Sequence, residues 1–445
     1  MQLKKLLALL LSAAMALTLL TGCDLDWLEE LLESGSSSST SSSSSMDAGP
    51  GGSGSDDSDR DDDDSNDGEE EDSKVDPEAP ETWVTGAIMT IPDGATITSE
   101  TVQKAMEGAQ GVSSIALSLD ANVGSDAFSG LSNITIQVRP VEGETLENAS
   151  ILGGAADVTL DLSQCVGLTI GGTAFAGNKD LKEVIFPSGV VIQDMPIDAS
   201  DPTGAFFDTG AFFGCTGLEK VTFRGSANVG WLAFAGCTSL SDVVSMDKIT
   251  QLGAGAFYGT AITTADLTGL IGTTLSTSIT FGGDTGDIGV AFMNCTQLTT
   301  VTLPKTIETI NYSSFTNCTS LKNINLGSVK TVGDMAFMDC DALQIADLKS
   351  AMVIGNSAFE GSDIKYLRLG ESLNSLGRSS FNSTIGLTIY YDAGEEAWKN
   401  KWDGHEQALA DAVLNGEVVK PDFEWESDIA AAQSAAGQLL GRFGF

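Results

Sequence analysis

The central and C-terminal parts of the chain repeat one pattern of apolar and polar positions. Each copy holds an Ala-Phe pair or a close variant, a later Leu or Ile, and a short alternating stretch such as Val301-Thr302-Leu303. Alternation with a period of two predicts a strand, with Val301 and Leu303 inward and Thr302 outward. The anchoring phenylalanines are Phe128, Phe175, Phe212, Phe234, Phe257, Phe292, Phe315, Phe337, Phe359 and Phe381.

The spacing of these anchors indicates the fold class. Phe315, Phe337, Phe359 and Phe381 follow one another at intervals of 22 residues. A period in this range with one short strand per unit predicts a leucine-rich-repeat solenoid: a right-handed coil of short parallel strands with turns or short helices between them. Two longer intervals place insertions at about 188–206 and 270–287, which are candidate functional loops.

The ends of the repeat array need caps, because an end coil cannot bury its own face. The segment 98–110 predicts a helix at the N-terminal end, and 406–414 predicts one at the C-terminal end. We therefore assign 83–114 to an N-terminal cap, 115–392 to the solenoid, and 393–445 to a C-terminal cap and tail.

The N-terminus has the pattern of an export signal. Lys4 and Lys5 precede an apolar run, 6–20, which is shorter than the roughly 20 residues that span a bilayer. The run ends in Thr21-Gly22-Cys23, which resembles the bacterial lipobox. The resemblance implies that residues 1–22 are a lipoprotein signal peptide and that Cys23 carries the lipid. The expected location is the extracellular face of a bacterial cell membrane, with the lipid as the anchor.

Composition changes sharply after the signal peptide. Residues 23–82 are rich in Ser, Asp and Glu and hold much of the formal net charge of −40. Such a stretch has too little apolar surface to fold, so we predict a disordered tether. The acidic balance also argues against a nucleic-acid partner, which requires clusters of Lys and Arg.

The repeat is specific enough to point to a family. The pattern Gly-x-x-Ala-Phe-x-x-Cys-x-x-Leu-x-x-Val-x-Leu-Pro resembles the BspA-like leucine-rich repeat of bacterial surface proteins, and 298–304 and 181–187 match it well. The resemblance covers roughly 115–403. It implies adhesion or binding of host factors, without shared catalytic residues.

The cysteines and the histidine suggest no catalysis. Most of the seven cysteines follow an anchoring Phe by three residues, which is not metal-ligand spacing. We interpret them as buried thiols, with disulfides between neighbouring coils as the alternative outside the cytoplasm. The one histidine, His405, lies beyond the last repeat, and no nucleophile, phosphate-loop or metal-helix motif occurs. We therefore predict no enzyme, no catalytic residues, no metal and no cofactor.

A binding surface is expected on the outward strand positions, which form two columns along the solenoid. Thr, Asn and Asp in the middle of these columns suit a polar ligand. The candidate residues are Lys220, Thr222, Asp266, Thr300, Thr302, Asn323, Asn325, Asp347, Tyr366 and Arg368. Trp231 and Tyr258 are further candidates for exposed anchors, although core packing is favoured for Trp231.

Three hypotheses for function follow. The leading one is a surface lipoprotein whose solenoid binds an extracellular protein or glycan in an adhesion-type role. The alternatives are a self-associating structural protein of the envelope and, less favoured, a hydrolase with an unfamiliar site. A pull-down that retrieves only the protein itself favours the second hypothesis, and turnover on a glycan or peptide panel favours the third.

Overall fold

The computed structural model describes residues 79–109, 111–194, 210–277, 289–382, 384, 386–414 and 418–442 of the chain. The expected signal peptide, Cys23 and nearly all of the tether lie outside the described residues, as does most of each insertion. The described part is a parallel-strand solenoid of about 12 coils with little helix, so the predicted fold class is confirmed.

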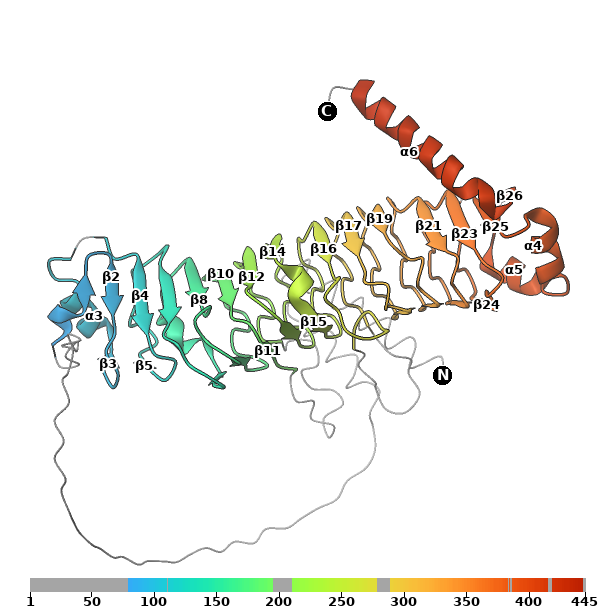
Figure 1. Cartoon of the computed structure of the whole chain (residues 1–445). Helices are drawn as coiled ribbons and strands as arrows, with labels where there is room; N and C mark the ends of the chain where they lie inside the picture. Colours follow the sequence, from blue (N-terminus) through green and yellow to red (C-terminus); the bar gives the residue numbers. More distant parts are fainter. Residues whose placement is uncertain are drawn as a thin grey trace, which may run out of the picture. The chain divides into compact units, whose positions relative to one another are not determined.

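The first side of each coil is the predicted alternating strand (Figure 1). These strands pair in parallel with their neighbours, in sheets whose breaks fall between β14 and β16 and between β19 and β21. Inward residues such as Ile115, Val184 and Leu367 are completely buried. The strands are β2 (Ile88–Thr90), β4 (Ser114–Leu117), β6 (Thr135–Val138), β8 (Val158–Asp161), β10 (Leu181–Phe186), β12 (Lys220–Phe223), β14 (Asp242–Val244), β16 (Thr264–Asp266), β17 (Thr300–Thr302), β19 (Asn323–Ile324), β21 (Ile345–Leu348), β23 (Tyr366–Leu369), β25 (Thr388–Tyr391) and β26 (Val418–Lys420).

The expectation of one strand per coil is wrong, because a second, shorter strand forms a separate side. It covers the residues just before the repeat Gly, such as Thr331-Val332, and pairs in parallel with its neighbours. Only its inward residue is apolar in most coils, so it contributes one core side chain per coil. These strands are β3 (Thr96–Ile97), β5 (Asn122–Val123), β7 (Thr145–Leu146), β9 (Thr169–Ile170), β11 (Val190–Ile192), β13 (Ala227–Val229), β15 (Ile249–Leu252), β18 (Thr309–Ile310), β20 (Thr331–Val332), β22 (Val353–Ile354) and β24 (Ser375–Leu376).

The turn that carries the anchoring Phe forms the remaining side. From Phe175 to Phe381 the rings stack in one column, with neighbouring centroids 5.0–5.7 Å apart. Each turn bends through left-handed backbone: Met335 and Asp339, two residues before and after Phe337, both have φ of 57°. The later position is Gly, Asn or Asp in every coil from Phe175 to Phe359, the residue types that tolerate this conformation best.

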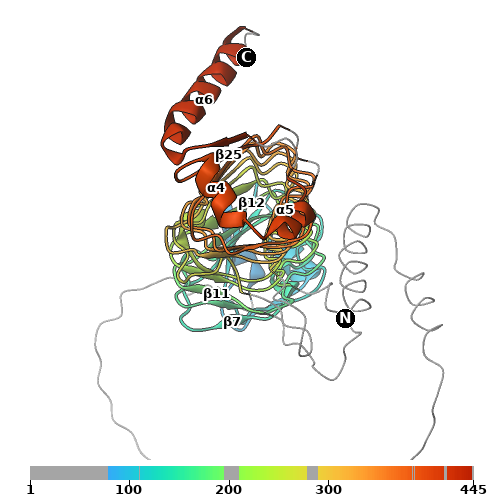
Figure 2. The same cartoon turned by 90° about the vertical axis from the view of Figure 1, so that its right-hand side faces the viewer.

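Both ends of the solenoid are capped (Figure 1), and Figure 2 looks onto the C-terminal cap. At the N-terminal end β1 (Val84–Thr85) pairs antiparallel with β2, and the helix α3 (Ser99–Ala105) begins at a Thr98–Thr101 capping box. At the C-terminal end α4 (Glu395–Trp402) and α5 (Glu406–Ala412) cover the last coil, and α6 (Trp425–Arg442) follows β26. Short 3-10 helices are η1 (Pro80–Thr82), η2 (Ala149–Leu152), η3 (Met246–Lys248) and η4 (Asp422–Glu424).

Candidate functional site

The outward face is defined as the solvent-side residues of the alternating strands from β4 to β25 and of their direct continuations. It carries the candidate binding residues of the two outward columns. Its residues alternate with core residues, as β17 shows: Val301 is buried between Thr300, which is half-buried, and Thr302, which is exposed. The strands supply a fixed backbone, so the identity of the outward side chains decides what the face can bind.

The middle of the outward face gathers exposed polar side chains. Pairing of β16 with β17 and of β17 with β19 sets Asp266 beside Thr302 and Thr300 beside Asn323. Asp266, Thr302 and Asn323 are all exposed. One oxygen of Asp266 accepts hydrogen bonds from the backbone N–H and hydroxyl of Thr268 at 3.1 and 2.7 Å, which fixes its orientation. This cluster offers a carboxylate, hydroxyls and an amide.

Asn325 lies at the edge of this cluster but has a structural role. Its Oδ1 accepts from the backbone N–H of Leu303 at 2.7 Å, and its Nδ2 donates to the Leu303 carbonyl at 2.8 Å. The side-chain amide of Asn325 thus takes the place of backbone hydrogen bonds beyond the point where the pairing of β17 with β19 ends. Asn325 is exposed, yet both ends of its amide group already have partners.

Thr222 was expected to be an accessible residue of the outward face, but its side chain is buried, at 9% exposed. It lies in register between Ile185 of β10 and Val244 of β14, and these larger side chains shield it. Lys220, two residues earlier, is half-buried and binds Glu183 of β10 at 2.9 Å. Much of the charge of this region is thereby neutralised within the face.

The C-terminal end of the outward face is covered by the chain itself. Arg368 donates from Nε to Asp422 Oδ1 at 2.6 Å and from its terminal nitrogens to Asp347 and Asp422, and its guanidinium lies 5.6 Å from the centroid of the Trp425 ring. Arg368, expected on the ligand surface, thus holds the segment that follows β26, and Asp347 accepts a hydrogen bond from Arg368 beside it. Tyr366 remains half-buried beside them.

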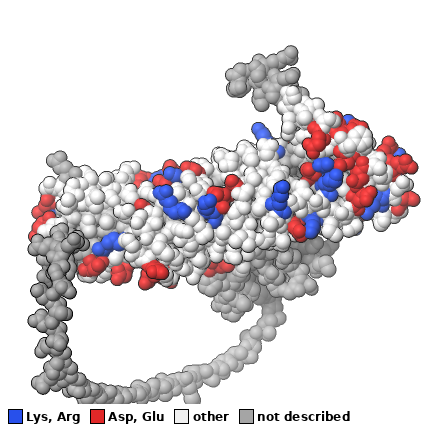
Figure 3. Space-filling view, in the orientation of Figure 1, with Lys and Arg blue, Asp and Glu red and all other residues white. Residues whose placement is uncertain are grey.

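Electrostatics at this junction are strong. The hydrogen bond from Arg368 lowers the pKa of Asp422 to about 2, with Lys349 acting in the same direction from 2.6 Å. Tyr390, an outward residue of β25, is fully buried, and its hydroxyl donates to Asp428 at 2.8 Å. Burial and the Asp428 carboxylate raise the pKa of Tyr390. In Figure 3 charged side chains concentrate at this end, whereas the middle of the visible face is mainly uncharged.

The cysteines form a hydrogen-bonded ladder beside the Phe column. Cys318 Sγ donates to the Phe292 carbonyl of the preceding coil at 3.1 Å, and Cys340 Sγ donates to the Phe315 carbonyl at 3.2 Å. Ser362 takes the same position and donates from Oγ to the Phe337 carbonyl at 2.6 Å. The six described cysteines are buried and free, as the interpretation of buried thiols requires.

The described residues show no metal-ligand cluster, and their histidine lies at the C-terminal cap. They contain no group of three or more His, Cys, Asp or Glu side chains arranged to hold a metal ion. His405 is exposed and packs edge-on against Trp402, with ring centroids 5.9 Å apart. No helix in the described part of the chain has the length and apolarity to cross a membrane.

A groove on the second sheet, at β11, β13 and β15, was not predicted from the sequence. The clue was the position of the two insertions, whose described ends, Asp194 and Thr277, border this groove. Trp231 lies between them and is half-buried rather than packed in the core, whereas Tyr258 is completely buried and accepts a hydrogen bond from Asn294 at 2.9 Å. The interpretations of Trp231 as a core residue and of Tyr258 as an exposed anchor are both wrong.

Stacked coils with a parallel strand, a Phe column and a regular turn define a protein of the leucine-rich-repeat solenoid class. The family model of the BspA-type leucine-rich repeat region matches residues 205–280 and 272–388, in six copies. Residues 205–388 therefore match the BspA-type leucine-rich repeat, and the fold of the described chain agrees with this match.

Solved structures similar to this chain come from bacteria. A leucine-rich-repeat protein from Bacteroides ovatus is 20% identical, with 68% of this chain and 82% of that chain covered and a TM-score of 0.36. A leucine-rich cell surface protein from Faecalibacterium prausnitzii is 19% identical, with coverages of 59% and 85% and a TM-score of 0.25. A leucine-rich-repeat protein from Eubacterium ventriosum is 18% identical, with coverages of 62% and 90% and a TM-score of 0.24. A search among curated proteins found no match.

Proposed function

We propose that the chain is a lipid-anchored bacterial surface protein whose outward face binds an extracellular protein or glycan in an adhesion-type role. The observation that carries this proposal is the cluster of Asp266, Thr302 and Asn323. These side chains are exposed on three adjacent strands, where Asp266 is in register with Thr302 and Asn323 is in register with Thr300. Exposed polar groups on a rigid scaffold are typical of binding surfaces, and the repeat family supports a role in binding.

The location follows from the N-terminal pattern. Cys23 after Thr21-Gly22 is the proposed lipid attachment site, and the acidic tether would hold the solenoid away from the membrane. We expect Cys23→Ala to release the protein from the membrane fraction into the medium or periplasm. Unchanged retention of this variant in a fractionation experiment would argue against the anchor.

The binding proposal is tested with the full chain on an array of extracellular matrix proteins and glycans. A ligand of the outward face should lose affinity in the variants Asp266→Ala, Thr302→Ala and Asn323→Ala. Thr331→Ala, on a strand of the second sheet, is the matched control and should bind normally. Binding that none of the three variants weakens would contradict the assignment of the face.

A blank array from well-folded protein would favour the self-associating envelope protein. Sedimentation of the same sample distinguishes the two, because self-association gives species larger than one chain and depends on concentration. Turnover of an arrayed glycan or protein, abolished by replacing one carboxylate, would favour the hydrolase instead.

A further inference from the structure

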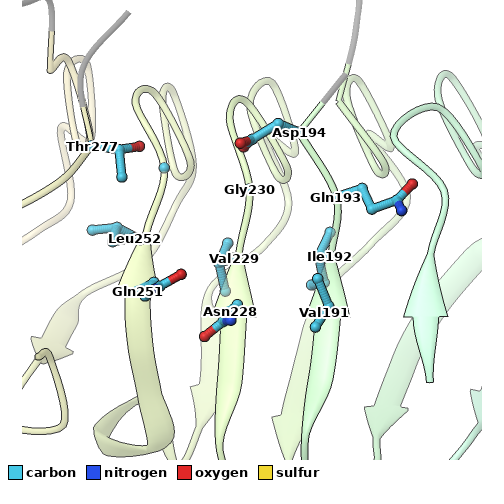
Figure 4. A pocket seen from close by; sticks show the side chains of 11 residues that line it. Val191, Ile192, Gln193, Asp194, Asn228, Val229, Gly230, Gln251, Leu252 and Thr277 are labelled. Carbon is cyan, nitrogen blue, oxygen red and sulfur yellow. The ribbon is translucent and has the colours of Figure 1, made fainter. Parts of the chain in front are cut away.

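The groove on the second sheet crosses three successive coils, on a side of the solenoid separate from the outward face. It has a volume of about 560 Å³, in the range of small-molecule sites. Val191, Asn228 and Gln251 lie on its three strands, and Asp194 and Thr277 lie beyond the strand ends, as Figure 4 shows. None of its lining residues is Lys or Arg.

Trp231 adjoins this groove, because it follows the lining residue Gly230 and bonds two further lining residues. Its backbone N–H donates to Asp194 Oδ1 at 2.6 Å, and its indole Nε1–H donates to Thr277 Oγ1 at 2.9 Å. Thr277 lies along the outer edge of β15, because its N–H donates to the Leu252 carbonyl of that strand at 2.8 Å. The indole must therefore cross the coil of Gly253, where a Cβ would lie only 2.3 Å from the Gly230 carbonyl carbon. Glycine at this position allows the backbone of the two coils to approach closely beside Trp231.

The polar groups of the groove are neutral amides and a hydroxyl, together with one carboxylate. Asn228 Oδ1 accepts from Thr250 Oγ1 at 2.8 Å, which leaves both amide hydrogens of Asn228 available. Gln193 and Gln251 are exposed, and no described residue forms a hydrogen bond with either side chain. Thr277 Oγ1 accepts from the indole and keeps its own hydrogen for donation. The groove thus presents both donors and acceptors next to an aromatic face.

These features together select one ligand chemistry. The lining has no Lys or Arg to pair with a phosphate, sulfate or uronate group, and it holds the carboxylate of Asp194, so an anionic ligand is disfavoured. An added peptide strand requires a free sheet edge, but Ile271 and Thr277 already donate to the carbonyls of Thr250 and Leu252 on the outer edge of β15. Hydroxyl groups pair with amides as donors and acceptors, and the C–H face of a sugar ring packs on an aromatic ring. We propose that this groove binds a neutral oligosaccharide, with Trp231 as its stacking platform and Asn228, Gln193 and Gln251 as its hydrogen-bonding groups.

The test uses the full chain and a panel of neutral di- to hexasaccharides of glucose, galactose, mannose and N-acetylglucosamine, with titration calorimetry on any that bind. Trp231→Ala should lower the affinity about tenfold or more, since it removes the aromatic surface. Gln251→Ala should lower it about threefold to tenfold, because one exposed amide is lost. Thr331→Ala, on a coil of the second sheet outside the groove, is the control and should leave saccharide affinity unchanged.

Circular dichroism and thermal melting of each variant separate lost binding from lost folding. If Trp231→Ala does not fold, the double variant of the exposed residues Gln193→Ala and Gln251→Ala decides the question. Failure of the panel to bind, binding that survives these substitutions, or preferential binding of anionic saccharides or peptides would overturn the proposal. Each of these results would leave the outward-face proposal standing, because that face is tested by different variants.

Discussion

The turn side of the solenoid and its outward face are built on the same repeat but differ in what they keep constant. On the turn side, the same ring returns in each coil, fully buried from Phe212 to Phe381 and stacked on its neighbours. On the outward face, equivalent positions hold Asp266, Thr302, Asn325, Asp347 and Arg368 in succession. A position that repeats in type and in burial serves the fold, whereas a position that changes from coil to coil is free to serve recognition.

The outward face itself divides into two regions. Its middle is open, whereas its C-terminal end is covered by β26 and the chain that follows, through Asp422, Trp425 and Asp428. Equivalent strand positions therefore have different roles: Thr302 is exposed, and Tyr390 is completely buried. The cap protects the last coil, which has no further coil to cover it.

The largest effect that separates the turn side from the outward face is expected from Phe337→Ala. The ring is fully buried between Phe315 and Phe359, with centroids 5.3 and 5.0 Å away, so its removal leaves a cavity that the neighbouring coils cannot close. We expect a loss of about 3–5 kcal/mol in the free energy of unfolding, measured by denaturant titration.

The matched control is Thr302→Ala on the outward face, which should change stability by less than about 0.5 kcal/mol. Similar losses for the two variants would remove the distinction between the two sides. A third possibility, local unfolding of the coils around Phe337 alone, would appear as a separate early transition and would still place the stabilising role on the turn side.

A smaller effect is expected at the covered end from Asp422→Asn. The pKa of Asp422 is lowered to about 2 by Arg368 and Lys349, below its ordinary 3.8. A lowered pKa in the folded state means that the ion pair stabilises the fold above pH 3.8 and that this contribution disappears as the pH falls toward 2. At pH 6 the variant should lose about 2 kcal/mol of protection in β26, measured by hydrogen exchange with β12 as an internal reference.

The same measurement near pH 2 supplies the control. There the carboxyl of the unsubstituted protein becomes neutral as well, so the difference between the two proteins should shrink. A difference of equal size at both pH values would show that the Asp422 charge does not hold the cap.

The sequence predicted the elements that depend on local pattern. The alternating strands, the Phe anchors and the buried thiols each follow from residues within one repeat, and the structure confirms the solenoid. The second strand was missed because two residues such as Thr331-Val332 are too short to show a period of two. Its indicator was the apolar residue before the repeat Gly, which recurs in most coils.

The sites were harder to predict because they join residues that are distant in sequence. Arg368 and Asp422 are 54 residues apart, and nothing in either repeat or tail indicates that they meet. The groove likewise combines Asp194, Trp231 and Thr277 from separate coils. Thr222 shows that position alone does not predict exposure. Its outward position was predictable, but its burial depends on the larger neighbours Ile185 and Val244 on the adjacent strands.

The smallest expected change in stability concerns the thiol ladder. It tests whether the turn side requires a sulfur atom or only a hydrogen-bond donor at this position. Cys318 is fully buried, and burial raises the pKa of its thiol, so the group stays protonated and donates to the Phe292 carbonyl. Cys318→Ala leaves that carbonyl with the backbone N–H of Cys295 as its remaining partner, and the lost hydrogen bond should cost about 1 kcal/mol by denaturant titration. Cys318→Ser should cost less, because Ser362 already makes the equivalent hydrogen bond in this chain. Iodoacetamide should leave Cys318 unmodified until the protein unfolds. Equal losses for the two variants would show that the hydrogen bond contributes nothing and that the thiol only fills space.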